Sequence, residues 1–114
     1  MTLREQQSAF VLNVAKLIQW AYANGYELTF SDAYRSPEAA AINAQNKTGI
    51  ANSLHTQRLA IDLNLFRSGA LLSSVADYLP LGKYWESIDP LCTWGGRFSK
   101  PDADHFSMTR DGIR

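Results

Sequence analysis

Two histidines and three aspartates are the residues in this sequence best suited to chemistry. His55 and His105 are the only histidines among the 114 residues; Asp62 follows the first by seven positions, and Asp102 and Asp104 precede the second. Neutral imidazole and carboxylate together suit Zn²⁺, and three protein ligands leave a fourth position for water, as in catalytic zinc sites. Composition alone leaves a second interpretation open, in which both histidines are ordinary hydrogen-bonded core or surface residues.

A single metal ion can join these residues only if the chain turns between them. Seven residues of extended strand span roughly 23 Å at about 3.3 Å per residue, whereas ligand atoms lie about 2 Å from zinc. We therefore expect residues 55–59 to fold back before the next strand begins. Asp102 and His105 would face opposite sides of a regular strand, so we also expect a turn or bulge near Ala103, within a turn-prone segment.

The remaining sequence predicts the elements that would position these residues. Hydrophobic periodicity predicts a helix over 3–24 that Asn24-Gly25 ends, and Ser36-Pro37 favours the start of another. The expected elements are a helix at 3–24, a strand at 27–30, a helix from 37 to 45, a strand at 60–66, a turn at 67–69, a helix at 73–88 broken near Pro80 and Gly82, a loop at 94–98 and a last strand around 105–108. Together they predict a small α+β domain with a short antiparallel sheet packed with helices.

Composition and charge narrow the functional classes. With 46% apolar and 19% charged residues, the chain can bury a core, and we expect one domain over residues 1–114 and a monomer. The formal net charge of zero argues against a nucleic-acid binder. Cys92 is the only cysteine, which excludes an intrachain disulfide and a thiolate-rich zinc finger; we expect it to be buried and inert. We find no secretory signal and no membrane-spanning stretch, so we expect cytoplasmic accumulation.

Three segments resemble motifs of one peptidase superfamily. Residues 53–62, Ser-Leu-His-Thr-Gln-Arg-Leu-Ala-Ile-Asp, resemble the Ser-x-His-x-x-Gly-x-Ala-x-Asp signature of the zinc D-Ala-D-Ala carboxypeptidases, a superfamily that includes phage L-alanyl-D-glutamate endopeptidases (endolysins). Residues 102–106 resemble its second motif, an acid three residues before the last ligand histidine, and residues 34–38 resemble its Tyr-Arg-Ser/Thr-x-Glu segment. One departure is Arg58, which stands where the pattern has glycine and could narrow the cleft or change the turn.

The resemblance implies roles for the candidate residues. His55, Asp62 and His105 would be the zinc ligands. Asp102 would be the general base, because zinc lowers the pKa of bound water toward ~7 and a nearby carboxylate can take the proton and pass it to the leaving amine. Asp104 competes for that role, although a solvent-facing loop acid is the interpretation we favour for it.

Other residues are candidates for contacts with substrate. Arg35 could stabilise the oxyanion or hold a substrate carboxylate, or it could be a surface arginine at a helix start. Ser53 could bind substrate or orient the first ligand histidine, or it could be a turn serine. Trp94 is our aromatic candidate for the cleft, with Trp85 and Tyr84 as others, although aromatic residues at such positions are more often core.

The resemblance also implies a fold and a reaction. The fold would be the hydrolase fold shared with the hedgehog signalling domain, and the substrate would be a peptide stem or crosslink of bacterial peptidoglycan. We expect an endolysin that cleaves the L-Ala–D-Glu bond and acts on the wall after release through the membrane. The alternatives are a D,D-carboxypeptidase or dipeptidase, and a zinc-stabilised binding domain without catalysis; an intact Asp102 and Arg35 argue against the last.

Overall fold

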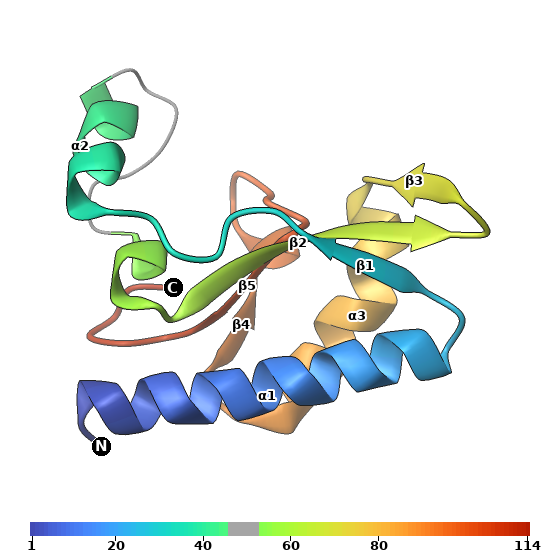
Figure 1. The fold of residues 1–114 in the computed structure, drawn as a ribbon, viewed down its shortest axis with the longest axis horizontal. Helices are drawn as coiled ribbons and strands as arrows, with labels where there is room; N and C mark the ends of the chain where they lie inside the picture. Colours follow the sequence, from blue (N-terminus) through green and yellow to red (C-terminus); the bar gives the residue numbers. More distant parts are fainter. Residues whose placement is uncertain (46–52) are drawn as a thin grey trace.

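The computed structural model describes residues 1–45 and 53–114 and has the predicted α+β architecture (Figure 1). Its elements in chain order are α1 (Leu3–Ala23), β1 (Glu27–Phe30), α2 (Pro37–Gln45), the 3₁₀ turn η1 (Leu54–Gln57), β2 (Ala60–Arg67), β3 (Ala70–Leu72), α3 (Val75–Ile88), β4 (Cys92–Trp94), the 3₁₀ turn η2 (Gly95–Arg97) and β5 (His105–Met108). None of the helices among the described residues combines the length and the apolar character that a membrane span requires.

The sheet is antiparallel and is organised around β2. The strand order is β1-β2-β5-β4, and the short β3 also pairs with β2. In the pairing of β2 with β5, Asp62 lies opposite His105 and Ile61 lies opposite Phe106. Directly opposed residues on antiparallel strands have Cβ atoms about 4.5–5.5 Å apart. The register therefore brings together two candidate ligands that are far apart in the sequence.

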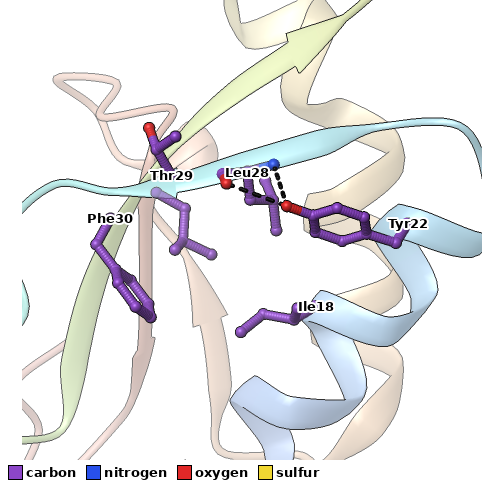
Figure 2. A pocket seen from close by; sticks show the side chains of 6 residues that line it. Ile18, Tyr22, Leu28, Thr29 and Phe30 are labelled. Carbon is purple, nitrogen blue, oxygen red and sulfur yellow. Dashed lines mark hydrogen bonds between the residues drawn. The ribbon is translucent and has the colours of Figure 1, made fainter.

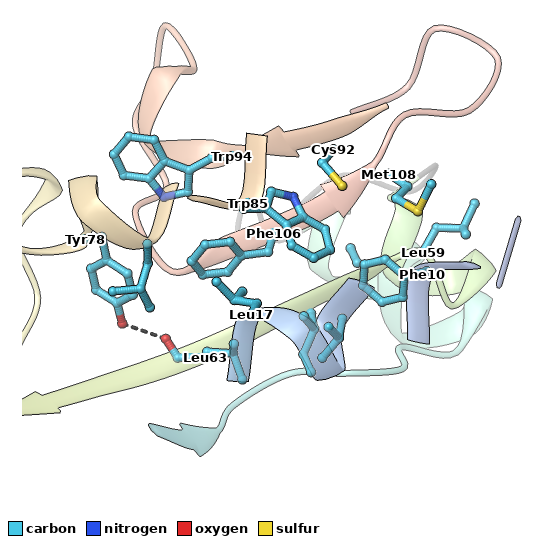
Figure 3. Close-up of a cluster of buried hydrophobic side chains, with 14 of the residues drawn as sticks. Phe10, Leu17, Leu59, Leu63, Tyr78, Trp85, Cys92, Trp94, Phe106 and Met108 are labelled. Atoms are coloured by element: carbon cyan, nitrogen blue, oxygen red, sulfur yellow. Dashed lines mark hydrogen bonds between the residues drawn. The ribbon is translucent and has the colours of Figure 1, made fainter. Parts of the chain in front are cut away.

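The core fills the space between the sheet and the helices α1 and α3 (Figure 3). Phe10 from α1 meets Trp85 from α3 edge to face, with ring centroids 5.8 Å apart, and Trp85 meets Phe106 of β5 in the same way at 6.0 Å. Edge-to-face contacts of this kind add to the stabilisation from burial. The Trp85 indole N–H also donates to the carbonyl oxygens of Thr93 and Ser107, both at 3.1 Å. Trp85 is thus a core residue that ties α3 to β4 and β5.

The turn predicted at 67–69 is a two-residue hairpin loop. Ser68 and Gly69 have φ values of 52° and 78°, which is the left-handed conformation that two-residue hairpin turns need. The loop leads directly into β3, a strand that the sequence did not predict because its three residues carry too short a pattern.

The predicted break in the helix at 73–88 is wrong, because α3 runs without interruption from Val75 to Ile88. Pro80 cannot donate to a carbonyl one turn earlier, but the buried side chains around it hold the helix against the sheet. Gly82 has a packing role: a Cβ there would lie 2.2 Å from Cδ2 of Trp94. Glycine in this helix therefore allows a close approach of the Trp94 indole and does not end the helix.

Candidate metal centre and active-site cleft

The turn η1 positions His55. The Ser53 hydroxyl oxygen accepts a hydrogen bond from the His55 backbone N–H at 3.2 Å and caps the turn. Arg58 then adopts the left-handed conformation, with φ 57° and ψ 37°, and Leu59 N–H donates to the Leu54 carbonyl at 3.0 Å. The chain thus folds back before β2 begins, as the spacing of His55 and Asp62 predicted.

A second turn positions His105. The His105 N–H donates to the Asp102 carbonyl at 3.2 Å, and the Asp102 N–H donates to the Gly95 carbonyl at 2.9 Å. This is the turn around Ala103 that the sequence predicted. Gly95 lies so close that a Cβ on it would be 2.3 Å from the Asp102 carbonyl oxygen and 2.8 Å from the His105 Cβ. The first residue of η2, directly after β4, therefore supports the turn from behind.

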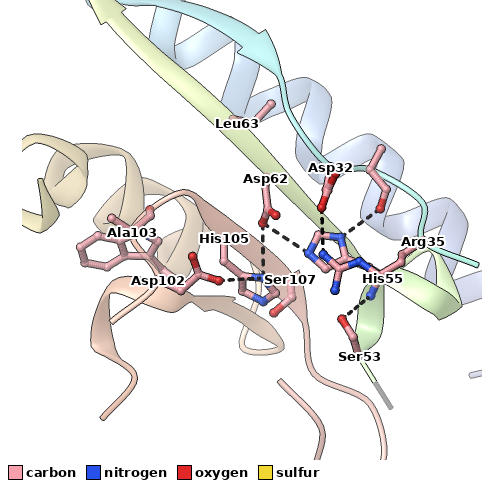
Figure 4. A network of polar contacts seen from close by, with 12 residues as sticks. Asp32, Arg35, Ser53, His55, Asp62, Leu63, Asp102, Ala103, His105 and Ser107 are labelled. Carbon is pink, nitrogen blue, oxygen red and sulfur yellow. Dashed lines mark hydrogen bonds and ion pairs between the residues drawn. The ribbon is translucent and has the colours of Figure 1, made fainter. Parts of the chain in front are cut away.

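Side-chain atoms of His55, Asp62 and His105 converge at the point where β2 pairs with β5 (Figure 4). Asp62 Oδ1 lies 3.3 Å from His55 Nε2 and 3.6 Å from His105 Nδ1. One potential ligand atom from each residue lies within 4.8 Å of the others. Both histidines are buried, with 3% and 5% of their surfaces exposed. The structure therefore brings together all three predicted ligands.

The hydrogen bonding of His55 prepares it to bind a cation. Its Nδ1 lies 3.0 Å from the Ala33 carbonyl oxygen, and since a carbonyl can only accept, Nδ1 carries the proton in the neutral ring. Nε2 then directs a lone pair toward the Asp62 carboxylate. Asp62 Oδ1 is buried and has no hydrogen-bond partner among the described residues. A lone pair and a carboxylate oxygen that face each other in a buried site fit a metal ion placed between them.

The pKa values of Asp62 and His55 reflect the burial of the cluster and the close contacts between its side chains. Burial alone would raise the pKa of Asp62, but the imidazoles of His105 and His55 outweigh it and lower the pKa to about 2. Burial opposes protonation of His55, yet the Asp62 carboxylate and the Ala33 carbonyl together raise its pKa. The carboxylate is therefore ionised at neutral pH, as a metal ligand must be.

Asp102 and Asp104 lie beside the cluster in different environments. Asp102 lines the cleft with 54% of its side chain exposed, and its Oδ2 is 3.9 Å from His105 Nδ1. Asp104 lies in the turn before β5, as expected of a loop acid, but it is half-buried and not fully exposed to solvent. Burial, with the adjacent Asp102 carboxylate, raises the pKa of Asp104 to about 7. Asp102 is the one that faces the cleft, as a general base must.

The candidate ligands open onto a cleft of about 490 Å³, a size typical of small-molecule sites. It is lined by Arg35, Ser53, His55, Asp62, Phe98, Lys100, Pro101, Asp102, His105 and Arg114. The sequence analysis did not single out Phe98, Lys100 or Arg114. The position of Lys100, two residues before Asp102, could have indicated that it lies near the site. Arg114 is distant in sequence from the candidate ligands and could not be placed without the fold.

Arg35 lies on the wall of this cleft. Its backbone N–H donates to the His55 carbonyl at 3.2 Å, and its guanidinium pairs with Asp32 at 2.9 Å. Its side chain is 18% exposed. Arg35 therefore lies near the metal cluster, where a contact with substrate requires it. Its ion-pair partner Asp32 was not identified in the sequence analysis.

The structure does not bring Trp94 to the cleft. Its side chain is 1% exposed and is absent from the cleft lining. Cβ atoms added to Gly82 or Gly96 would each lie 2.2 Å from its indole ring, so the indole packs directly against both backbones. Its N–H donates to the Ala103 carbonyl at 2.7 Å. Trp94 therefore holds the turn that carries Asp102, and the prediction that it contacts substrate is corrected.

Arg58 points away from the metal cluster. Its guanidinium carbon lies 4.0 Å from the centroid of the Tyr34 ring, and both residues line a separate apolar groove that includes Phe10 and Ile61. The residue that replaces the family glycine thus keeps the left-handed turn and does not narrow the cleft.

A further hollow lies between α1 and β1 (Figure 2). The Tyr22 hydroxyl, at its edge, bonds the backbone of Leu28 at 3.3 Å. Its lining is Ile18, Tyr22, Leu28, Thr29, Phe30 and Leu63. None of these residues is a histidine, a carboxylate or a cation, so this hollow offers no metal site.

Comparisons with known proteins agree with this geometry. The sequence profile of the D-alanyl-D-alanine carboxypeptidase family matches residues 45–108, a range that contains all three candidate ligands and Asp102. The chain belongs to this peptidase family. Its fold is similar to the crystal structure of Serratia marcescens L-Ala D-Glu endopeptidase ChiX, with a TM-score of 0.72 and 16% identity over 90% of this chain and 79% of that one. No curated protein sequence matches the chain.

Family membership and fold confirm the predicted resemblance. The match begins at residue 45 and therefore does not include the segment 34–38. For that segment, the argument that Arg35 belongs to the site comes from its place in the cleft.

Proposed function

We propose that the protein is a zinc-dependent peptidoglycan peptidase that hydrolyses the L-Ala–D-Glu bond of the peptide stem. The observation that carries the proposal is the convergence of His55, Asp62 and His105 beside an open cleft that also contains Asp102. Membership of the carboxypeptidase family supports the reaction class. The similar fold of a protein described as an L-Ala D-Glu endopeptidase supports the choice of bond.

Zinc fits the donor set of the cluster. Two imidazoles and one carboxylate are typical ligands of catalytic zinc, and three protein ligands would leave one coordination position for water. The buried Asp62 Oδ1 without a hydrogen-bond partner among the described residues is the atom that most needs a cation. When bound, zinc would supply a Lewis acid and would lower the pKa of a water molecule toward ~7.

The side chains around the cluster would transfer the proton and stabilise the charge that develops during hydrolysis. Asp102 takes a proton from the water that attacks the peptide carbonyl, and it returns that proton to the amine when the C–N bond breaks. Arg35 lines the same cleft and stabilises the negative charge that develops on the carbonyl oxygen when water attacks. Ser53 contributes by capping the turn that holds His55.

Mass spectrometry of purified peptidoglycan after digestion tests the proposal. New N-terminal D-Glu would identify the L-Ala–D-Glu endopeptidase. Released D-Ala would identify a D,D-carboxypeptidase instead, a second candidate that the description of the matched family favours. Zinc binding without any new peptide end would favour the binding domain and would contradict the proposed enzyme.

We further propose that the protein is a monomeric endolysin. It would accumulate in the cytoplasm and reach the wall after the inner membrane is opened. Its expression in bacterial cytoplasm should leave cells intact until the membrane is permeabilised. Wall damage in cells with an intact membrane would contradict this proposal.

A further inference from the structure

Lys100 and Arg114 are two cations on the metal cleft that the mechanism above does not use. Both line the cleft together with the candidate ligands. Within residues 1–45 and 53–114 neither side chain forms an ion pair, whereas Arg35, the third cation of the cleft, is paired with Asp32. Among the described residues, the cleft therefore contains two cationic side chains without an ion-pair partner.

The ring of Phe98 holds one of these cations close to the reacting centre. The guanidinium carbon of Arg114 lies 4.8 Å from the Phe98 ring centroid, and that ring lies 5.5 Å from the ring of His105. A cation over an aromatic face is stabilised by the ring quadrupole, and the stacking restricts the guanidinium while its N–H groups remain free to donate. Lys100 enters the same cleft from the segment that precedes Asp102.

The charges that remain in the cleft define the ligand. The carboxylates of Asp62 and Asp102 face the metal cluster, and a bound zinc ion would offset their charge. Lys100 and Arg114 are then available to an anion, and the planar guanidinium suits a carboxylate because it can donate two parallel hydrogen bonds. We propose that Lys100 and Arg114 bind a free carboxylate of the substrate next to the scissile bond, and so select acidic stem peptides; this rests on the proposed peptidase function.

A matched pair of substrates tests the selection. One is a stem peptide that contains L-Ala–D-Glu with the free D-Glu carboxylate, and the other carries a carboxamide there, which has nearly the same shape and no charge. Rates are measured as kcat/KM with the zinc-loaded protein. We expect the acid to be preferred by at least about tenfold, mainly through KM, which is the size of one charge-assisted hydrogen bond. In Lys100→Gln/Arg114→Gln the ratio of acid to amide should fall toward one.

Two exposed cations away from the cleft supply the control. Arg4 is the second residue of α1 and Lys83 lies on α3, and neither lines the cleft. Arg4→Gln/Lys83→Gln removes the same total charge and should keep the ratio of the parent protein. A ratio that falls equally in this control would overturn the proposal, because the effect would then be one of overall charge. Melting temperatures of both double variants check that the fold is retained.

A binding measurement separates this inference from the proposed reaction. Calorimetry of both peptides with zinc-loaded Asp102→Asn gives the dissociation constants without turnover. Tighter binding of the acid that depends on Lys100 and Arg114, with no hydrolysis by the parent protein, would remove the proposed function and support the carboxylate site. Hydrolysis of both peptides at equal kcat/KM, with equal binding, would support the peptidase and overturn the carboxylate site.

Discussion

Gly95 supports the metal site through its lack of a side chain, and Gly95→Ala should therefore damage the site from behind. The added Cβ would lie 2.3 Å from the Asp102 carbonyl oxygen and 2.8 Å from the His105 Cβ. Comfortable contacts between such atoms are about 3.5 Å or longer, so the turn must move by roughly 1 Å. The nearest atom belongs to the backbone and cannot rotate away.

The expected magnitude has two parts. Overpacking of this kind lowers the free energy of unfolding by about 1–3 kcal/mol. The Gly95 carbonyl also accepts hydrogen bonds from Phe98 at 3.1 Å and Asp102 at 2.9 Å, and the shift strains both. Because His105 is displaced as well, we expect zinc affinity to fall by about 10–100-fold, the usual effect of disturbing the groups that support metal ligands.

Two measurements and one control decide the matter. Urea unfolding of the metal-free protein gives the stability, and competition with a chelator gives the zinc affinity. Gly69→Ala is the control: nothing lies within 4 Å of its Cβ, but φ is 78°, so alanine costs about 1–2 kcal/mol by strain alone. The control should lose stability and keep zinc affinity. Unchanged zinc affinity in Gly95→Ala, or an equal loss in Gly69→Ala, would refute the steric argument.

Four further predictions concern other parts of the structure. Asp102→Ala should retain zinc, as measured by elemental analysis, while its rate of hydrolysis falls by about 10²–10⁴-fold. The loss of rate in Asp104→Ala should be far smaller. Loss of zinc from Asp102→Ala would make Asp102 a ligand. Arg35→Ala should lose at least about tenfold in rate, or 1.4 kcal/mol, with little change in melting temperature because an exposed ion pair contributes at most about 1 kcal/mol; unchanged turnover would remove Arg35 from the mechanism. Burial, together with the nearby Asp89 carboxylate, raises the pKa of Cys92 to about 12. Cys92 therefore stays a thiol at pH 8 and should react with thiol reagents only after unfolding. Mass spectrometry that shows rapid labelling of the folded protein would contradict this. Arg58→Gly relieves backbone strain at the left-handed position and removes the stacking contact with Tyr34, so the zinc affinity, measured by competition with a chelator, should not change. A clear loss of zinc affinity would mean that the stacking supports the site.

Local sequence rules predicted the parts of the site that depend on chain geometry. A metal shared by His55 and Asp62 required a reversal before β2, and Asp102 could join His105 only through a turn; both turns are present. The residue types and spacing were sufficient here because the turns are short and their hydrogen bonds are local.

Predictions failed where a distant element decides the outcome. Gly82 has a low helix propensity, but the indole of Trp94 packs against it and the helix continues. The same contact buries Trp94, which sequence alone had assigned to the cleft. Lys100 resembled any surface lysine until the fold placed it on the cleft wall. Tertiary contacts of this kind leave no local pattern in the sequence.

Because Asp62 lies opposite His105, the proposed metal site depends on the register of β2 and β5. A slip of one residue between β2 and β5 would turn one of these side chains to the other face of the sheet, and the cluster would no longer exist. Zinc would then bind only after two strands that are distant in the sequence have paired correctly. It would stabilise that arrangement by about 2.7 kcal/mol when free zinc exceeds the dissociation constant a hundredfold. Bound zinc would therefore add to the free energy of unfolding only when β2 and β5 pair in this register.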